Sequence, residues 1–357
     1  MMDWEKTLDI YFRDLEKQDL FSGVVLITKG DSQLYNGAYG YASRPWKIKN
    51  TLETRFDTAS ITKLFTSVAT LQIIDQGQFD FETPVIDFLG LKDTTISKDV
   101  NVFHLLTHTS GIGDDSEEED GEVYEDLWKT KSNYSVTNTT DFLPQFIHKP
   151  ANFPPGEGCC YCNCSYVLLG LMIEKVSGIS YRDYVRENVF ANAQMDYSDF
   201  LRLDRVHENV AEGSDPIQDE AGNVVGWKKN IYSFPPIGSP DSGAHVTAND
   251  LDAFLRSVAA EQLLSPELTM AFFSPQVHYR EINNWTLMYG YGLKFYLDKA
   301  GEVVCTQKEG INAGVSALIR NYPALDVNVV LLSNLEEGVW DPIWVIHELL
   351  TPEEANL

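Results

Sequence analysis

Ser60 and Lys63 are the residues whose types and spacing point most directly to chemistry. They form an S-x-x-K motif at the start of an apolar helical pattern that ends near Gly77. Residues three apart on a helix lie on one face, so the lysine amine can reach the serine hydroxyl. A serine hydroxyl is a weak nucleophile at its ordinary pKa, and a desolvated lysine beside it can remove its proton. The motif therefore predicts an activated serine nucleophile.

The alternative for this motif is a solvated pair on a helix surface, because serine and lysine are both common residues. The residues that follow favour a buried helix, since apolar side chains recur at helical spacing at Ile61, Leu64, Phe65, Val68, Leu71 and Ile74. Ser60 would then open that helix, where its backbone N–H has no intrahelical acceptor and the helix dipole favours negative charge. A substrate oxygen that gains charge would be stabilised there.

Further motifs follow in order: L-L-T-H-T-S-G-I over Leu105 to Ile112, Tyr161-Cys162-Asn163 after Pro155-Gly156, and Lys308-Glu309-Gly310. With S-x-x-K they make the chain resemble the class C β-lactamase-like serine hydrolases, a group that includes low-molecular-weight penicillin-binding proteins, D-amino-acid peptidases and carboxylesterases. The resemblance covers nearly the whole chain. It implies an α+β fold of the β-lactamase/transpeptidase type, in which an antiparallel sheet is flanked by terminal helices and interrupted by a mainly helical insertion.

The resemblance assigns roles to the Y-x-N motif. Tyr161 would share proton transfer with Lys63, and Asn163 would donate its amide to the substrate acyl group. A phenol titrates near pH 10, so Tyr161 can act as a base only if neighbouring cations such as Lys63 and Lys308 favour the phenolate. The alternative is an ordinary loop tyrosine and a turn asparagine.

The third family motif is K-T-G or H-T-G on a strand that lines the site, and Lys308-Glu309-Gly310 takes its place. The resemblance implies that the backbone N–H groups of Ile311 and Ser60 form an oxyanion hole. Glu309 replaces threonine or serine. A glutamate about 4 Å from a substrate carboxylate costs about 1 kcal/mol in water and about 4 kcal/mol at an effective dielectric of about 20, which disfavours penicillins and D-Ala-D-Ala peptides. Alternatively, Glu309 points away from Lys308 as a solvated edge charge, because side chains alternate along a strand.

These features predict a serine hydrolase that works through a covalent acyl-enzyme on an ester, amide or peptide-like substrate. No metal or organic cofactor is expected. Within the hydrolases, the alternative is a D-aminopeptidase, or a D-Ala-D-Ala carboxypeptidase with weak β-lactamase activity. An alternative of another class is a catalytically idle binding module related to penicillin-binding proteins. The presence of Ser60, Lys63, Tyr161 and Asn163 argues against that module.

Three further segments are expected to be structural. His108 lies in a turn after a helix, where polar side chains bond local backbone. Thr247 to Asp250 has the form of a capping box that opens a helix. The acidic run from Asp114 to Asp120 is expected to be a solvated, mobile loop. As an alternative, this run rims the active site and disfavours anionic substrates.

Four of the five cysteines crowd around Tyr161, at Cys159, Cys160, Cys162 and Cys164. Their spacing does not match a zinc site, and only Cys305 and distant histidines could complete one. We expect reduced thiols that pack as small apolar residues. A further hypothesis is that oxidation beside Tyr161 inactivates the enzyme.

The composition limits the class of protein to which this chain can belong. The chain has 357 residues, of which 43% are hydrophobic and 22% charged, and its formal net charge is -26. It is expected to form a single domain over 1–357, with an α/β part (1–57 and 240–350) and a helical part (58–239). The negative charge argues against nucleic acid and membrane partners, which leaves a small-molecule or short-peptide substrate. The first residues lack the features of a signal peptide, so a cytoplasmic location is expected, and the oligomeric state stays open.

Hydrophobic periodicity predicts the elements around these motifs. A helix over 4–15 precedes strands over 23–28 and 33–39, which are joined by a turn at Lys29-Gly30-Asp31. The chain is then mainly helical until about 239. Strands return near Met288 and are expected over 290–296, 303–307, 313–319 and 328–332, followed by a closing helix over 342–350. The nucleophile would lie where the helical insertion meets the sheet.

Overall fold

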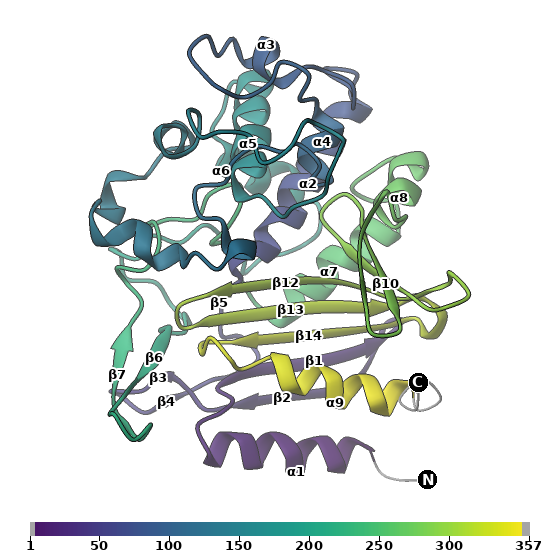
Figure 1. Ribbon diagram of the computed structural model, residues 1–357. Helices are drawn as coiled ribbons and strands as arrows, with labels where there is room; N and C mark the ends of the chain where they lie inside the picture. The colour runs from purple at the N-terminus through teal and green to yellow at the C-terminus, as the bar shows by residue number, and fades with distance from the viewer. Residues whose placement is uncertain (1–3, 352–357) are drawn as a thin grey trace.

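The computed structural model of the chain describes residues 4–351, and its centre is an eight-stranded sheet in the order β2-β1-β14-β13-β12-β11-β10-β9 (Figure 1). Every neighbouring pair in this sheet is antiparallel. The strands are β1 (Gly23–Lys29), β2 (Ser32–Tyr39), β9 (Val277–Ile282), β10 (Trp285–Tyr289), β11 (Lys294–Leu297), β12 (Val303–Asn312), β13 (Val315–Tyr322) and β14 (Val327–Ser333). The expected α+β fold is confirmed.

The two faces of the sheet are covered by different helices. On β1, Val25 and Ile27 pack with Leu8 of α1 (Trp4–Lys17) and Ile343 of α9 (Trp340–Leu350). The alternate residues, such as Val24, belong to the larger core beneath the helical part. Both faces of β1 are therefore buried, which explains why its sequence is an unbroken apolar run.

The helical part is built around two buried helices, α2 (Thr62–Asp75) and α5 (Asn163–Ser177), which pack against each other. Each is buried on all sides over most of its length. Gly77 follows the end of α2 with a φ of 67°, as its position in the sequence predicts. The other α-helices in the described part of the chain are α3 (Val85–Leu89), α4 (Val102–Leu106), α6 (Tyr181–Val185), α7 (Ala248–Ala259) and α8 (Pro266–Phe272).

Several predicted elements need correction. The strand expected over 290–296 begins only at Lys294, because 290–293 form a turn between β10 and β11, in which Gly292 has a φ of 91°. The sheet resumes at β9, earlier than the expected return near Met288. The hairpin of β6 (Ser214–Gln218) and β7 (Val224–Lys229) lies within the segment expected to be mainly helical.

Other predictions are confirmed. The terminal helices, the first hairpin and the last two strands lie where periodicity places them. The Thr247 side chain accepts a hydrogen bond from the Asp250 N–H at 3.1 Å and so caps α7. No helix within residues 4–351 is long and apolar enough to cross a bilayer.

Candidate active site

Ser60 lies in a 3₁₀ turn (Ala59–Ile61) that leads directly into α2. Ala59 adopts a φ of 43°, a left-handed conformation that costs a non-glycine residue free energy. Two contacts hold it in place: Asp57 Oδ1 accepts the Ala59 N–H at 2.7 Å, and the Thr62 hydroxyl donates to the Ala59 carbonyl at 2.7 Å. The strained turn presents Ser60 to the neighbouring cavity.

Lys63 is fully buried one helical turn beyond Ser60. Its Nζ lies 3.2 Å from Ser60 Oγ, 2.7 Å from Asn163 Oδ1 and 2.8 Å from the Asp241 carbonyl oxygen. Burial lowers the pKa of Lys63, although surrounding carboxylates, Asp241 foremost, oppose this shift. A neutral amine has two hydrogens and one lone pair. Since Asn163 Oδ1 and the Asp241 carbonyl accept the two hydrogens, the lone pair is left for the Ser60 hydroxyl.

Tyr161 lies between the two lysines of the site. The Nζ atoms of Lys63 and Lys308 are each 4.9 Å from the centre of its ring, and it shares a hydrogen bond with Ser60. Burial, reinforced by the negative charge of Glu118, nevertheless raises the pKa of Tyr161 well above its ordinary value. Lys63 and Lys308 therefore do not produce the phenolate that a base at Tyr161 would require. Tyr161 is a protonated phenol that can donate rather than accept a proton.

Asn163 is placed by the start of α5, and Asp114 fixes that start. The N–H groups of Asn163 and Cys164 each donate to one oxygen of the Asp114 carboxylate at 2.8 Å. A carboxylate at a helix N-terminus satisfies amides that have no intrahelical acceptor. The expectation of a solvated loop is wrong here, because Asp114, Asp115 and Ser116 are buried.

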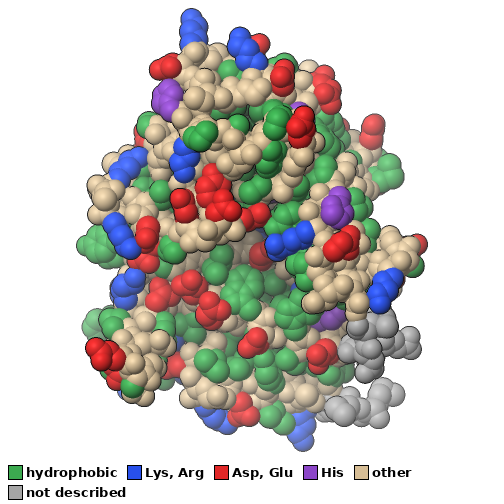
Figure 2. Space-filling view, viewed as in Figure 1, with side chains coloured by type: hydrophobic (Ala, Val, Ile, Leu, Met, Phe, Trp, Pro, Cys, Tyr) green, Lys and Arg blue, Asp and Glu red, His purple; other side chains and the backbone are tan. Residues whose placement is uncertain are grey.

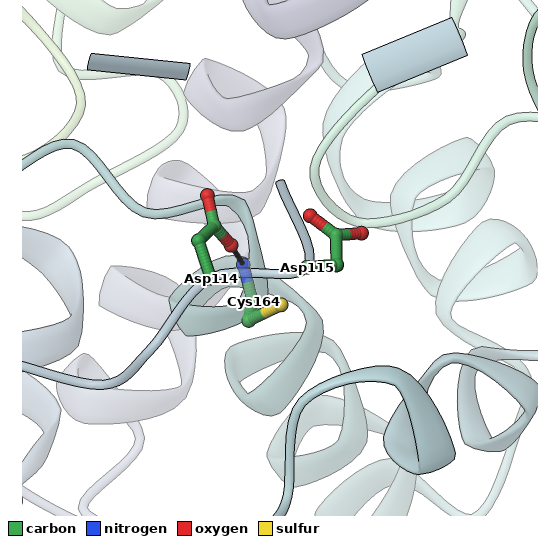
Figure 3. Close-up of side chains that lie close together, drawn as sticks. All are labelled: Asp114, Asp115 and Cys164. Atoms are coloured by element: carbon green, nitrogen blue, oxygen red, sulfur yellow. Dashed lines mark hydrogen bonds between the residues drawn. The ribbon is translucent and has the colours of Figure 1, made fainter. Parts of the chain in front are cut away.

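Asp114, Asp115 and Cys164 bring their possible metal-ligand atoms within 4.8 Å of one another (Figure 3). Both oxygens of Asp114 already accept amide hydrogens. Burial and the neighbouring Asp114 raise the pKa of Asp115 well above its ordinary value, and burial raises that of the Cys164 thiol. These groups favour holding protons over binding a cation, so we assign the cluster a structural role.

The third motif lies on β12, next to the turn that contains Ser60. A Cβ atom at Gly310 would lie 2.1 Å from the Thr58 carbonyl oxygen and 2.9 Å from the Ser60 nitrogen. Only glycine permits this approach. Ile311 follows at the cavity wall with 42% of its surface exposed. The absence of a side chain at Gly310 thus brings the backbone of β12 next to the backbone of Ser60.

Glu309 lines the cavity and forms an ion pair with Lys294 of β11, so the alternative of a solvated edge charge is wrong. Gln307 also donates to its carboxylate at 3.1 Å. Burial alone would raise the pKa of Glu309, but Lys294 and Lys308 outweigh burial and lower the pKa to about 2. Burial, aided by repulsion from Lys63, lowers the pKa of Lys308 to about 7. The ion pair with Lys294 weakens the repulsion that Glu309 was expected to exert on a substrate carboxylate.

These groups surround a cavity of about 390 Å³ between the sheet and the helical part, and Figure 2 shows a hollow there with acidic side chains beside it. Ser60, Tyr161, Lys308, Glu309 and Ile311 were predicted to belong to the site, and all line this cavity. Lys63 and Asn163 lie behind it. Four lining residues were not predicted from the sequence: Tyr279, Arg280, Tyr289 and Lys294. Glu118 and Glu119 also line the cavity, and they belong to the acidic segment for which a place at the rim of the active site was the alternative prediction.

His108 is structural, as expected. It is fully buried, and its Nδ1 accepts the Cys162 N–H at 3.1 Å while its ring packs 4.7 Å from that of Tyr161. Burial, with repulsion from Lys308, lowers the pKa of His108 well below its ordinary value. A neutral His108 therefore supports the segment that carries Tyr161.

All five cysteines are free thiols. Cys162 and Cys164 are buried in the core, as expected of small apolar residues. Cys159 and Cys160 are partly exposed, and burial followed by the charge of Glu119 raises the pKa of each to about 12. Inactivation by oxidation stays a prediction.

Comparison with known proteins decides the family, because the family description "Beta-lactamase" matches residues 8–343. The chain belongs to the beta-lactamase family. It is 27% identical over 350 residues to a penicillin-binding protein of Bacillus subtilis (strain 168), a match that covers 93% of this chain and 72% of that protein. It is therefore an enzyme of the serine hydrolase type.

Solved structures of this family share the fold. A penicillin-binding protein from Bacillus halodurans is 35% identical, with a TM-score of 0.86, over 94% of this chain and 99% of its own. The D-amino acid amidase of Ochrobactrum anthropi SV3, solved with L-phenylalanine amide, is 21% identical with a TM-score of 0.75, over 96% and 97% of the two chains. At that identity the likeness shows the fold alone.

Proposed function

We propose that this beta-lactamase family enzyme hydrolyses ester or amide bonds of small molecules or short peptides through an acyl-enzyme on Ser60. The observation that carries the proposal is the pair of acceptors on Lys63, Asn163 Oδ1 and the Asp241 carbonyl oxygen, which in the neutral amine leave the lone pair for Ser60 Oγ, 3.2 Å away. Lys63 takes the hydroxyl proton as Ser60 Oγ attacks the substrate carbonyl carbon. Burial lowers the pKa of Lys63, which favours the neutral amine that this step requires.

We infer that the backbone N–H groups of Ser60 and Ile311 stabilise the oxyanion that forms, a role supported by the close approach of β12 to the Ser60 nitrogen at Gly310. As the carbon–oxygen or carbon–nitrogen bond of the leaving group breaks, Tyr161 gives its phenolic proton to that group and regains one from protonated Lys63. Water then attacks the acyl-enzyme and releases the acid. The raised pKa of Tyr161 suits this role as a proton donor.

The substrate acyl group is best accommodated when it carries no carboxylate at neutral pH. Glu309 and Lys294 neutralise each other, and Lys308, with a pKa of about 7, is only partly charged. These features favour neutral esters and amides over penicillins and D-Ala-D-Ala peptides. The five free cysteines are typical of a reducing compartment, which supports a cytoplasmic location.

The test is a panel of p-nitrophenyl butyrate, nitrocefin and D-alanyl p-nitroanilide, followed by intact mass and peptide mapping of the quenched enzyme. We expect turnover of the ester or the anilide well above that of nitrocefin, and a mass increase equal to the acyl group on the peptide that contains Ser60. Acylation elsewhere, or no acylation with any of the three, would contradict the proposal.

Substrates with a carboxylate should show a distinct pH dependence, because Lys308 is charged below its pKa of about 7 and neutral above it. We expect kcat/KM for nitrocefin, relative to that for p-nitrophenyl butyrate, to fall about tenfold as the pH rises from about 6 to about 8. Pairs of rates measured at each pH cancel any change common to both substrates. In Lys308→Met the ratio should be low and independent of pH, and a ratio that still falls would assign the effect to another group.

A further inference from the structure

Glu118 is a charged side chain in the cavity that raises the pKa of Tyr161 but exchanges no proton in the proposed reaction. It lies in the 3₁₀ turn Glu118–Asp120, in the segment between α4 and α5, and it lines the same cavity as Ser60. Glu118 is an exposed residue, and no hydrogen bond or ion pair joins its carboxylate to another residue in the described part of the chain, 4–351. Partial desolvation in the cavity raises its pKa to about 6, against the attraction of Lys63 and Lys308, so the carboxylate is mainly charged at neutral pH. An exposed carboxylate in a substrate cavity is available to a ligand.

The neighbouring carboxylates are already engaged. Glu119 accepts hydrogen bonds from the Tyr279 hydroxyl at 2.7 Å and from the Tyr161 N–H at 3.3 Å. Glu309 is paired with Lys294. The carboxylates of Glu119 and Glu309 therefore have hydrogen-bond or ion-pair donors from the protein, whereas that of Glu118 has none within residues 4–351.

The turn that carries Glu118 is held from both sides. Glu119 ties it to β9 through Tyr279, and Glu117 Oε1 accepts the Asp114 N–H at 2.8 Å. Asp114 itself is bound to the start of α5. The position of Glu118 relative to Ser60 is therefore defined by the fold and requires no ligand to order it.

The surroundings of Glu118 suit a cation better than an anion. Lys294 is neutralised by Glu309, and burial lowers the pKa of Lys308 to about 7, so the Lys308 amine carries less than its full charge. The rings of Tyr161, Tyr279 and Tyr289 also line the cavity, and each already faces a cation of the protein, such as Arg280 at 4.5 Å from the centre of the Tyr279 ring. The aromatic lining is therefore of a kind that accommodates positive charge.

We propose that Glu118 binds the ammonium group of an amine-bearing substrate and thereby selects amino-acid amides, amino-acid esters and short peptides with a free amino terminus. This inference rests on the proposed function, since it places the amine of the acyl group in the cavity where Ser60 attacks its carbonyl. A charged hydrogen bond across a cavity recognises the amine strongly and specifically. Blocking the amine by acetylation removes the group that Glu118 binds.

The test compares wild type with Glu118→Gln on D- and L-alanyl p-nitroanilide, their N-acetyl derivatives, and p-nitrophenyl acetate. We expect the variant to lose about 10- to 100-fold in kcat/KM for the preferred free-amine anilide, mainly through KM. Rates with the acetylated anilide and the ester should stay within about twofold. Glu157→Gln is the matched control, because Glu157 is exposed outside the cavity and the substitution removes the same charge.

Two results would overturn the proposal while leaving the hydrolase intact. An equal loss of kcat on all substrates would make Glu118 a general base for the chemical step and not an amine-binding residue. Wild-type enzyme that acylates Ser60 with the ester, but shows no preference for a free amine over its acetyl derivative, would also refute it. A failure of Ser60 to be acylated by any of these substrates would instead contradict the proposed function.

Discussion

Ser60→Ala should lower kcat for p-nitrophenyl butyrate by about 10⁴-fold or more, because the methyl group has no oxygen with which to form the acyl-enzyme. A loss of that size corresponds to about 5.5 kcal/mol of transition-state stabilisation. Steady-state rates and the initial burst of p-nitrophenol measure it. The burst should disappear entirely, and no acyl adduct should be detected by intact mass.

The control is Ser67→Ala, one helical turn further along α2 than Lys63. The Ser67 hydroxyl lies 3.3 Å from that of Tyr166 and does not line the cavity. This variant should keep kcat within severalfold of wild type. Ser60→Ala should also unfold within a few degrees of wild type, so that lost activity reports lost chemistry. Residual Ser60→Ala activity above about one per cent, with an adduct on another residue, would place the nucleophile elsewhere.

The residues of the site that could be predicted from the sequence belong to short motifs. Ser60 and Lys63 are three apart on one helix, so their contact follows from local geometry. Apolar runs such as β1 and β14 likewise predict buried strands directly. Predictions of this kind hold in the folded chain because they depend only on the spacing of residues within one short segment.

The missed features depend on contacts between residues far apart in the chain. Asp114 caps α5 through amides 49 and 50 positions later. Lys294 reaches Glu309 only because β11 pairs with β12 in a register that places Lys294 opposite Gln307. Neither contact has a local signal in the sequence, since strand register and loop path are decided by packing.

The protonation states of Tyr161 and Lys63 also could not be predicted from the sequence. The two cations near Tyr161 suggest a lowered pKa, whereas the structure shows that burial reverses the direction. The second acceptor on Lys63 is the backbone carbonyl of Asp241, which any residue type at that position would supply. Burial and main-chain geometry decide whether Lys63 can act as a base, and neither can be predicted from the residue types alone.

The other large effect should come from Lys63→Met, which keeps the length of the side chain and removes the amine. We expect kcat to fall about 10³-fold, because Ser60 loses the group that accepts its proton. Asn163 Oδ1 and the Asp241 carbonyl would also lose their donor. Buried acceptors left without a donor cost about 1–3 kcal/mol each, so circular dichroism melts must accompany the rates.

The Lys63→Arg variant distinguishes two roles for Lys63, that of a base and that of a fixed positive charge. Arginine remains protonated at all ordinary pH values, so it preserves the charge but offers no lone pair. If Lys63 acts as the base, both variants should be inactive. Wild-type kcat/KM should fall as the pH drops below the pKa of Lys63, since protonation removes the lone pair, and burial places that limb below the ordinary lysine value. A folded Lys63→Arg enzyme within tenfold of wild type would show that charge, and not proton transfer, is what Lys63 contributes.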